Sequence, residues 1–333
     1  MNDGTGMEES VRAAPGAGLA GLWARPYLLL TLTAACWAGN SIVGRAARDF
    51  VPPIALSFWR WALALLLLLP LAWPHLRRDW PVLRAHWPIM ILLGMLGIGS
   101  FNTLLYSGLQ TTTALNAMLM QSAQPALILL IGALLMKERT TARQIAGVAV
   151  SLAGVLTIIS RGDLQALLAL RLNGGDAIIG FAVVLWAVYS VLLRRRPPVH
   201  PLSLLAGSIL IGIVAIAPFY AGELVQGRRI VVARESVLAI AYVAIFPSFL
   251  AYLFFNRGVE LIGSAATGQY MNVMPLIGAG LAIAFLGEEL HLFHVAGLFL
   301  VIAGIFVAGR SMQAPVTAAD AVVPARPSDG GRF

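Results

Sequence analysis

The stretch "LLMKERTTARQIAGVAVSLAG" at residues 134–154 places a short charged interval inside a long apolar sequence. A second stretch, "AFLGEELHLFHVAGLFLVIAG" at residues 284–304, has the same layout. Proline, glutamate and two glycines recur between these regions at one constant spacing of 150 residues. The pairs are Pro125 and Pro275, Glu138 and Glu288, Gly147 and Gly297, and Gly154 and Gly304. The chain therefore contains two copies of one unit.

The composition indicates an integral membrane protein. Hydrophobic residues make up 59% of the 333 positions and charged residues only 11%, which is more apolar surface than a water-soluble domain could bury. The net charge of +8 lies in short clusters between apolar runs, where it sets orientation, so we expect no nucleic-acid partner. The single cysteine, Cys36, excludes an intramolecular disulfide and a thiolate metal site.

About 20 apolar residues are needed to cross the hydrocarbon as a helix, and this length divides the chain into ten spans. We expect an all-α membrane protein with spans at residues 27–44, 54–73, 88–109, 114–136, 144–160, 177–193, 201–220, 237–256, 263–286 and 290–309. Residues 26–162 and 175–310 then form two five-helix repeats. Residues 1–25 have no apolar core of a cleaved signal peptide, and like residues 311–333 they are expected to be flexible.

The distribution of Lys and Arg predicts the orientation. With the N-terminus in the cytoplasm, the loops and termini on that side hold 15 of these residues and the opposite side holds seven. The positive-inside rule therefore places both termini in the cytoplasm of a bacterial inner membrane. Because each repeat has an odd number of spans, the second copy enters the membrane from the opposite side. Inverted repeats of this kind are typical of secondary transporters with one midplane site.

The sequence resembles the ten-span EamA type of the drug/metabolite transporter superfamily over residues 27–310. The resemblance is carried by "CWAGNSIVGRAA" at residues 36–47, by Arg60 in "FWRWALALLLL", and in each half by a Pro, an acidic residue 13 positions later and two "AG" pairs. It implies a metabolite exporter and is similar to the amino-acid exporter branch. Two positions depart from the family pattern: Ala38 replaces a common Gly, and the second copy reads "WAVYS" without the Asn.

Arg60 is the one clear charge inside the predicted hydrocarbon region, where a charge costs roughly 2.5–3.5 kcal/mol on insertion scales. One interpretation is a contact with a substrate carboxylate. The other, which we favour from the sequence alone, is an arginine that extends to the interface or binds a helix C-terminus. No Asp or Glu lies at the centre of a span, so proton coupling through such a residue is not expected. Glu138 and Glu288 are assigned to capping of the helices that follow them.

The remaining polar and aromatic residues recur in both halves and form the predicted binding site. In each half two of them lie three positions apart just before the Pro, on one helix face, where amides could bind a neutral or zwitterionic ligand or hydrogen-bond between helices. These are Gln121 and Gln124, and Gln269 and Asn272. Further lining residues are expected to be Trp37, Asn40, Trp186 and Tyr189. Singly, Trp and Tyr are as often interface residues as site residues.

One Asn and Tyr pair occurs in reverse order in the two halves at the same i, i+4 spacing. We interpret Asn102 with Tyr106, and Tyr252 with Asn256, as gates toward opposite faces. The glycines at 147, 154, 297 and 304 are expected to allow close helix packing. The acidic and histidine residues of "EELHLFH" have no counterpart in the first half, so no metal is predicted there.

The leading function is alternating-access export of small metabolites, with neutral or aromatic amino acids as the expected substrates. Neutral drugs or other metabolites are the alternative within the same class. A scaffold or channel is the alternative of another class, whereas an enzyme is not expected because no catalytic arrangement is visible. The expected partners are a small-molecule substrate and the lipid bilayer, the expected assembly is a monomer, and no cofactor is expected.

Overall fold

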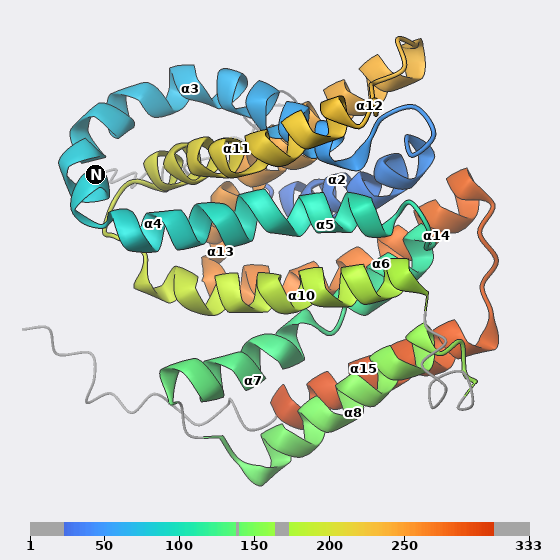
Figure 1. The fold of residues 1–333 in the computed structure, drawn as a ribbon. Helices are drawn as coiled ribbons and strands as arrows, with labels where there is room; N and C mark the ends of the chain where they lie inside the picture. Colours follow the sequence, from blue (N-terminus) through green and yellow to red (C-terminus); the bar gives the residue numbers. More distant parts are fainter. Residues whose placement is uncertain (1–22, 138–139, 164–172, 310–333) are drawn as a thin grey trace, which may run out of the picture.

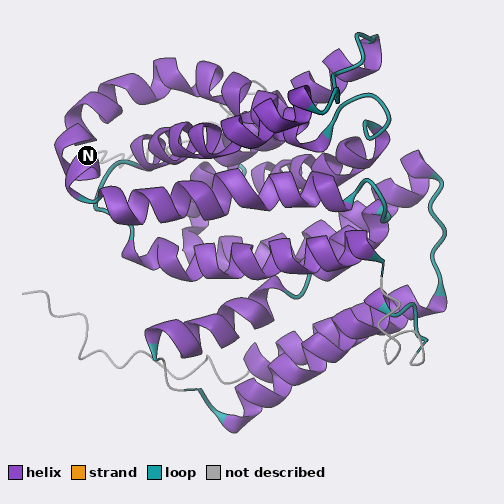
Figure 2. Ribbon diagram, in the orientation of Figure 1, coloured by secondary structure: helices purple, strands orange, loops and turns teal. Residues whose placement is uncertain are grey.

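The computed structural model describes residues 23–137, 140–163 and 173–309. In these ranges all regular structure is helical and no strand occurs, which confirms the all-α prediction (Figure 2). Residues 1–22 and 310–333, which hold most of the two ends predicted to be flexible, lie outside the described part. Glu138 also lies outside it.

The first half of the chain forms one continuous series of helices. Their bounds are α2 (Pro26–Ala46), α3 (Pro53–Ala85), α4 (Trp87–Leu93), the π-helix η1 (Gly94–Ser100), α5 (Phe101–Gly108), α6 (Ala114–Gln121), α7 (Gln124–Met136) and α8 (Ala142–Ile159). The second half repeats this order. Its bounds are α10 (Gly174–Leu192), the 3-10 helix η2 (Leu193–Arg195), α11 (Pro201–Val225), α12 (Arg234–Ile245), the π-helix η3 (Phe246–Leu250), α13 (Ala251–Tyr270), the 3-10 helix η4 (Met271–Val273), α14 (Met274–Leu286) and α15 (Leu292–Gly309).

Local sequence explains several helix ends. Proline occupies the first turn of α2, α3 and α11, where its missing N–H is no loss. Thr141 and Gln144 form a capping box that begins α8. The helices α7 and α14 both end at a left-handed residue, Lys137 with φ 55° and Gly287 with φ 62°. These two positions are 150 residues apart, so the repeat extends to backbone conformation.

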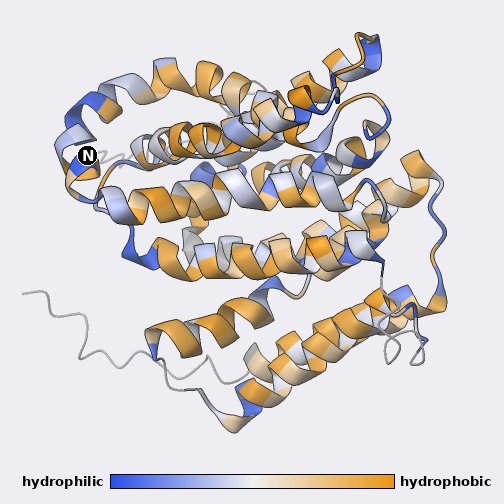
Figure 3. Cartoon of the chain, in the orientation of Figure 1, coloured by the Kyte–Doolittle hydropathy of each residue, from blue (hydrophilic) through white to orange (hydrophobic). Residues whose placement is uncertain are grey.

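Seven helical segments are long and apolar enough to cross a membrane, or eight if the bent pair α6 and α7 is one span. The remaining two apolar helices, α14 and α15, are shorter than this limit. Large apolar side chains on the outside of the bundle, such as Leu66 at 65% exposure and Phe299 at 70%, suit contact with lipid. Hydrophilic residues gather toward the helix ends (Figure 3). The membrane class is confirmed, and the count of ten spans stays a prediction.

The helix α3 is longer than the predicted span at residues 54–73. It continues to Ala85 and contains three internal prolines along a curved path (Figure 1). The arginines at 77, 78 and 84, expected in a loop, therefore lie on this helix. Hydropathy marks only the part of a helix that suits hydrocarbon, whereas the polar end of α3 is held by Asp79, whose carboxylate accepts a 2.9 Å hydrogen bond from the backbone N–H of His200.

The fourth predicted span is broken. The helix ends at Gln121 and restarts at Gln124, and the axes of α6 and α7 differ by 44°. The ninth predicted span is interrupted too, because Gly263 has φ 82° within α13 and η4 separates α13 from α14. Interrupted helices expose backbone polar groups at membrane depth, which is tolerated only inside protein or beside a cavity.

Packing follows the repeat. The helix α8 packs along α15 and α3 along α11, while α2 contacts α13 and α14 as α10 contacts α5 and α7 (Figure 1). Glycines form the contact between α8 and α15, as the sequence predicts. A Cβ added at Gly147 would lie 2.5 Å from the Gly304 carbonyl oxygen, and one at Gly154 would lie 2.6 Å from that of Gly297. Only glycine allows this close approach of the two backbones.

Candidate functional site

The guanidinium of Arg60 lies at the centre of a buried polar cluster. Its Nη1 donates to Asn40 Oδ1 at 2.7 Å, to Asn102 Oδ1 at 2.6 Å and to the Tyr106 hydroxyl at 2.8 Å. Its Nε donates to the Ser248 hydroxyl. The Tyr106 hydroxyl donates in turn to Asn40 Oδ1, and the Asn40 amide donates to Asn102 Oδ1 at 3.3 Å. The cluster is therefore internally connected.

Arg60 is only 3% exposed, so it neither extends to the membrane interface nor binds a helix end. The interpretation that we favoured from the sequence is wrong for this reason. The partners come from α2, α5 and η3, which belong to both halves of the chain. Sequence spacing within one helix could not show that these distant segments meet at one side chain.

A π-helical turn precedes the site residues in both halves. The segment η1 ends just before Asn102, and η3 ends two residues before Tyr252. The hydroxyl of Ser100 donates to Met95 O at 2.8 Å and that of Ser248 donates to Val243 O at 2.6 Å, in each case five residues back. Single π turns within α-helices occur frequently at functional sites. Here they turn the Asn and Tyr residues that follow them toward the interior of the bundle.

The residues predicted as gates do not all lie apart from the central site. Asn102 and Tyr106 are buried in the Arg60 cluster. Tyr252 packs edge-on against Trp61, whose ring centroid lies 4.6 Å from Arg60 Cζ. Asn256 lies one turn farther along α13 and is half-buried.

The aromatic residues of α2 and α10 pack in matching ways. Trp37 donates from its indole to Pro247 O at 3.0 Å, and its ring lies 5.8 Å from that of Tyr252. In the other half Trp186 lies 4.7 Å from Phe101 and 5.0 Å from Tyr189. These residues thus contact the helices that follow the two π turns, next to the Arg60 cluster on the side of Trp37.

The amide residues are less clearly placed. Gln121 is buried and donates to Ala117 O, one turn back in its own helix, at 3.0 Å, while Gln124 is half-buried at the start of α7. Because the helix breaks between them, the continuous face assumed from their spacing is absent. The side chains of Gln269 and Asn272 lie outside the described part of the structure.

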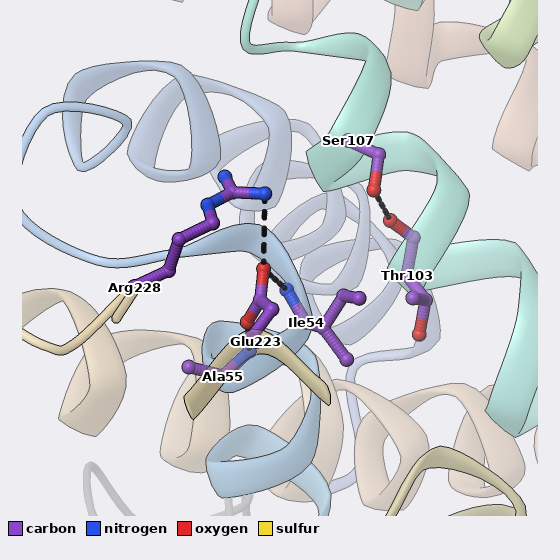
Figure 4. A network of polar contacts seen from close by, with 6 residues as sticks. All are labelled: Ile54, Ala55, Thr103, Ser107, Glu223 and Arg228. Atoms are coloured by element: carbon purple, nitrogen blue, oxygen red, sulfur yellow. Dashed lines mark hydrogen bonds and ion pairs between the residues drawn. The ribbon is translucent and has the colours of Figure 1, made fainter. Parts of the chain in front are cut away.

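Buried carboxylates tie the repeats together at helix ends. Glu288 accepts hydrogen bonds from the N–H groups of Ala114 and Leu115, so it caps α6 in the first repeat and not the following helix α15, as we expected. Glu223, at the end of α11, accepts from Ile54 and Ala55 in the first turn of α3 at 3.3 and 2.8 Å. Arg228 lies 3.6 Å from the same carboxylate (Figure 4).

Sequence reasoning missed a second buried network, centred on Asp176 in the first turn of α10. Its carboxylate accepts from the Thr112 hydroxyl and, at 3.2 Å, from the Asn116 amide. Asn116 Oδ1 lies 2.9 Å from Nε2 of His294, which is 4% exposed. This network joins α6, α10 and α15. The only sequence signal was a carboxylate placed just before an apolar span.

The comparisons with known proteins agree with this architecture. The model of the EamA-like transporter family matches twice, at residues 24–160 and 173–310. The uncharacterized transporter YyaM of Bacillus subtilis is 32% identical over 68% of this chain and 74% of its own length. A probable amino-acid metabolite efflux pump of Salmonella typhimurium is 25% identical over 84% of this chain and 93% of that protein.

A solved crystal structure is similar in fold, with a TM-score of 0.58 and 20% identity over 87% of this chain and 99% of that chain. The two matches of the family model cover both halves of the helical bundle. They include the helices that supply Arg60 and its four polar partners. The chain is a member of the EamA-like transporter family, and its two halves each carry one copy of the family's unit.

Proposed function

We propose that this protein is a secondary transporter that exports small metabolites, with neutral or aromatic amino acids as the expected substrates. Membership of a transporter family supports the transport function. The printed name of the Salmonella relative supports amino-acid metabolites and the outward direction. The proposed location is a bacterial inner membrane with both termini in the cytoplasm, which rests on the distribution of Lys and Arg.

The observation that carries this proposal is the position of the Arg60 cluster. It joins side chains of α2, α3 and α5 in the first repeat to Ser248 of η3 in the second. A binding site formed by both repeats can be exposed to either face when one repeat moves relative to the other. The aromatic side chains of Trp37, Trp61 and Tyr252 form an apolar wall beside this polar centre, which suits an amphipathic solute.

Two structural features support alternating access around this site. The helices α6 and α13 are interrupted at matching depth, at the break after Gln121 and at Gly263, so each repeat contains a discontinuous helix. The matching π turns η1 and η3 supply a second pair of irregular segments. Irregular backbone can absorb the changes in φ and ψ that a moving element requires.

The test is counterflow in proteoliposomes that contain the full-length chain, with labelled amino acids and a panel of other metabolites, in the presence and absence of a pH gradient. A carrier gives saturable flux that an unlabelled substrate of the same class inhibits. Flux that rises linearly with concentration supports the channel alternative, and no flux with any solute supports a scaffold. Inhibition by neutral drugs but not by amino acids supports the alternative substrate class.

A further inference from the structure

The charge of Arg60 has no acidic partner. All four of its hydrogen-bond acceptors are neutral, and no carboxylate lies within ion-pair distance of its guanidinium among the residues that the structure describes. A buried charge is strongly disfavoured unless another charge or enough hydrogen bonds compensate it. In the same part of the chain Nη2 has no hydrogen-bond acceptor, so one edge of the guanidinium has donor capacity that the protein does not use.

The neighbouring residue supplies a second, independent observation. Trp61 is 0% exposed, and its indole Nε1 has no hydrogen-bond partner. Its ring lies under the guanidinium, with the centroid 4.6 Å from Arg60 Cζ. Buried donors without an acceptor are rare and indicate a missing partner. Two adjacent residues therefore each offer an unused N–H in one buried region that also carries an uncompensated positive charge.

A carboxylate matches both features. Each of its oxygens accepts hydrogen bonds, it pairs well with a guanidinium, and its single negative charge balances one arginine. A phosphate carries more charge than this single cation could balance. The substrate's ammonium group, by contrast, has no acidic partner here, and the amide oxygens of Asn40 and Asn102 already accept from Arg60.

Resting on the transport function proposed above, we infer that Arg60 and Trp61 form a subsite for the carboxylate of an organic acid that has no free ammonium group. The apolar or aromatic body of this acid packs against Tyr252, which lies 6.5 Å from Trp61 and 5.8 Å from Trp37 between ring centroids. The preferred substrate is thus a net anion, such as an N-acylated amino acid, and not the zwitterion.

Three probes with one common body test this inference: N-acetyl-L-phenylalanine, L-phenylalanine and N-acetyl-L-phenylalaninamide. Binding to the purified full-length protein is measured by tryptophan fluorescence, and transport by counterflow in proteoliposomes. We expect the acid to bind at least tenfold more tightly than the zwitterion and the neutral amide. Arg60→Gln should weaken binding of the acid at least tenfold without changing binding of the amide, and Arg60→Lys should lose less.

Trp61→Phe keeps the aromatic ring and removes only the N–H, so it should weaken binding of the acid severalfold and leave binding of the amide unchanged. The matched control is Arg48→Gln, which removes one positive charge from an exposed ion pair with Asp49 and should behave as the wild type. If Arg60→Gln does not fold, Arg60→Lys and Trp61→Phe still decide the question, since both retain size and packing.

Equal binding of acid and amide, preference for the zwitterion, or an acid-to-amide ratio that no variant changes would overturn the carboxylate subsite. Failure of the transport function gives a different result, in which the acid binds in an Arg60-dependent manner but no probe shows counterflow. Saturable counterflow of the amide or the zwitterion with no dependence on Arg60 preserves the transport function and overturns the subsite.

Discussion

Glu288 of the second repeat accepts a 2.7 Å hydrogen bond from the backbone N–H of Leu115, in the first turn of α6. The same carboxylate accepts from Ala114 at 2.9 Å, so one side chain satisfies two N–H groups at the start of a helix in the other repeat. Such groups have no partner within their own helix. The contact therefore fixes the start of the broken fourth span relative to the end of α14.

The first prediction is that Glu288→Gln destabilises the protein without changing its substrate preference. Loss of a charged cap costs about 0.5–2 kcal/mol, and we expect a lower midpoint of thermal unfolding in detergent. The matched control is Glu289→Gln, because Glu289 is 83% exposed and should have little effect. A folded Glu288→Gln protein with altered selectivity would instead place Glu288 in the transport pathway.

The second prediction concerns the glycine contact between α8 and α15. Gly147→Ala should destabilise the fold, although alanine is the better helix former, because the new Cβ would lie 2.5 Å from the Gly304 carbonyl oxygen. Overpacking typically costs about 1–3 kcal/mol. Gly222→Ala is the control, because a Cβ at Gly222 has no atom within 4 Å. The control should be neutral or stabilising by up to about 1 kcal/mol, and equal thermal shifts in the two variants would contradict the packing role.

The sequence predicted the features that depend on the backbone. Gly, Pro and Glu at a spacing of 150 residues mark helix contacts, breaks and caps, so the duplication and the α8 to α15 contact could be predicted. The Arg60 cluster could not, because Asn40 lies 20 positions away and Ser248 lies 188 positions away. Periodicity identifies neighbours within one helix, whereas the cluster depends on how four separate segments pack.

The same limit explains the other errors. The shared face of Gln121 and Gln124 assumed an unbroken helix, but Pro125 follows a break and the two axes differ by 44°. Glu288 was assigned to the next helix in sequence, whereas the structure brings the start of α6 closer. Asp176 was overlooked because position near the end of a span does not indicate burial, which here arises from contacts with Thr112 and Asn116.

The third prediction compares two tyrosines of the matching pairs. Tyr106→Phe removes a hydroxyl that lies 2.8 Å from Arg60 Nη1, and a hydrogen bond to a charged group contributes about 1.5–3 kcal/mol. We expect substrate affinity to fall about tenfold or more, since Arg60 loses one of the groups that orient it. Tyr252→Phe keeps the ring packing against Trp37 and Trp61 and should retain affinity. The measurement is the half-saturation concentration in counterflow, with unfolding midpoints as the check on folding.

An equal loss of affinity in the two phenylalanine variants would show that ring packing does not explain the role of Tyr252. Unchanged affinity in Tyr106→Phe would remove the hydroxyl from the binding site. Tyr252→Ala extends the comparison, because it deletes the ring between Trp37 and Trp61 and should alter access from one face of the membrane without unfolding the protein.

The last prediction tests whether the two repeats are inverted. Asp49 precedes α3 in the first repeat, and Pro198, 149 positions later, precedes α11 in the second; both residues are exposed. If each repeat has five spans, these matching positions lie on opposite faces of the membrane. Single cysteines introduced by Asp49→Cys and Pro198→Cys in a Cys36→Ala background should therefore react with an impermeant maleimide from different sides. We expect labelling of Asp49→Cys in spheroplasts, and of Pro198→Cys only after permeabilisation.

The Cys36→Ala parent without an added cysteine is the control for background labelling. Labelling of both positions from the same side would mean an even number of spans in each repeat. The two halves would then be parallel, and the cluster around Arg60 could not alternate between the faces by exchange of their conformations. The same membranes with Asp49→Cys labelled only after permeabilisation, and Pro198→Cys labelled directly, would keep the inversion but reverse the orientation predicted from the Lys and Arg distribution.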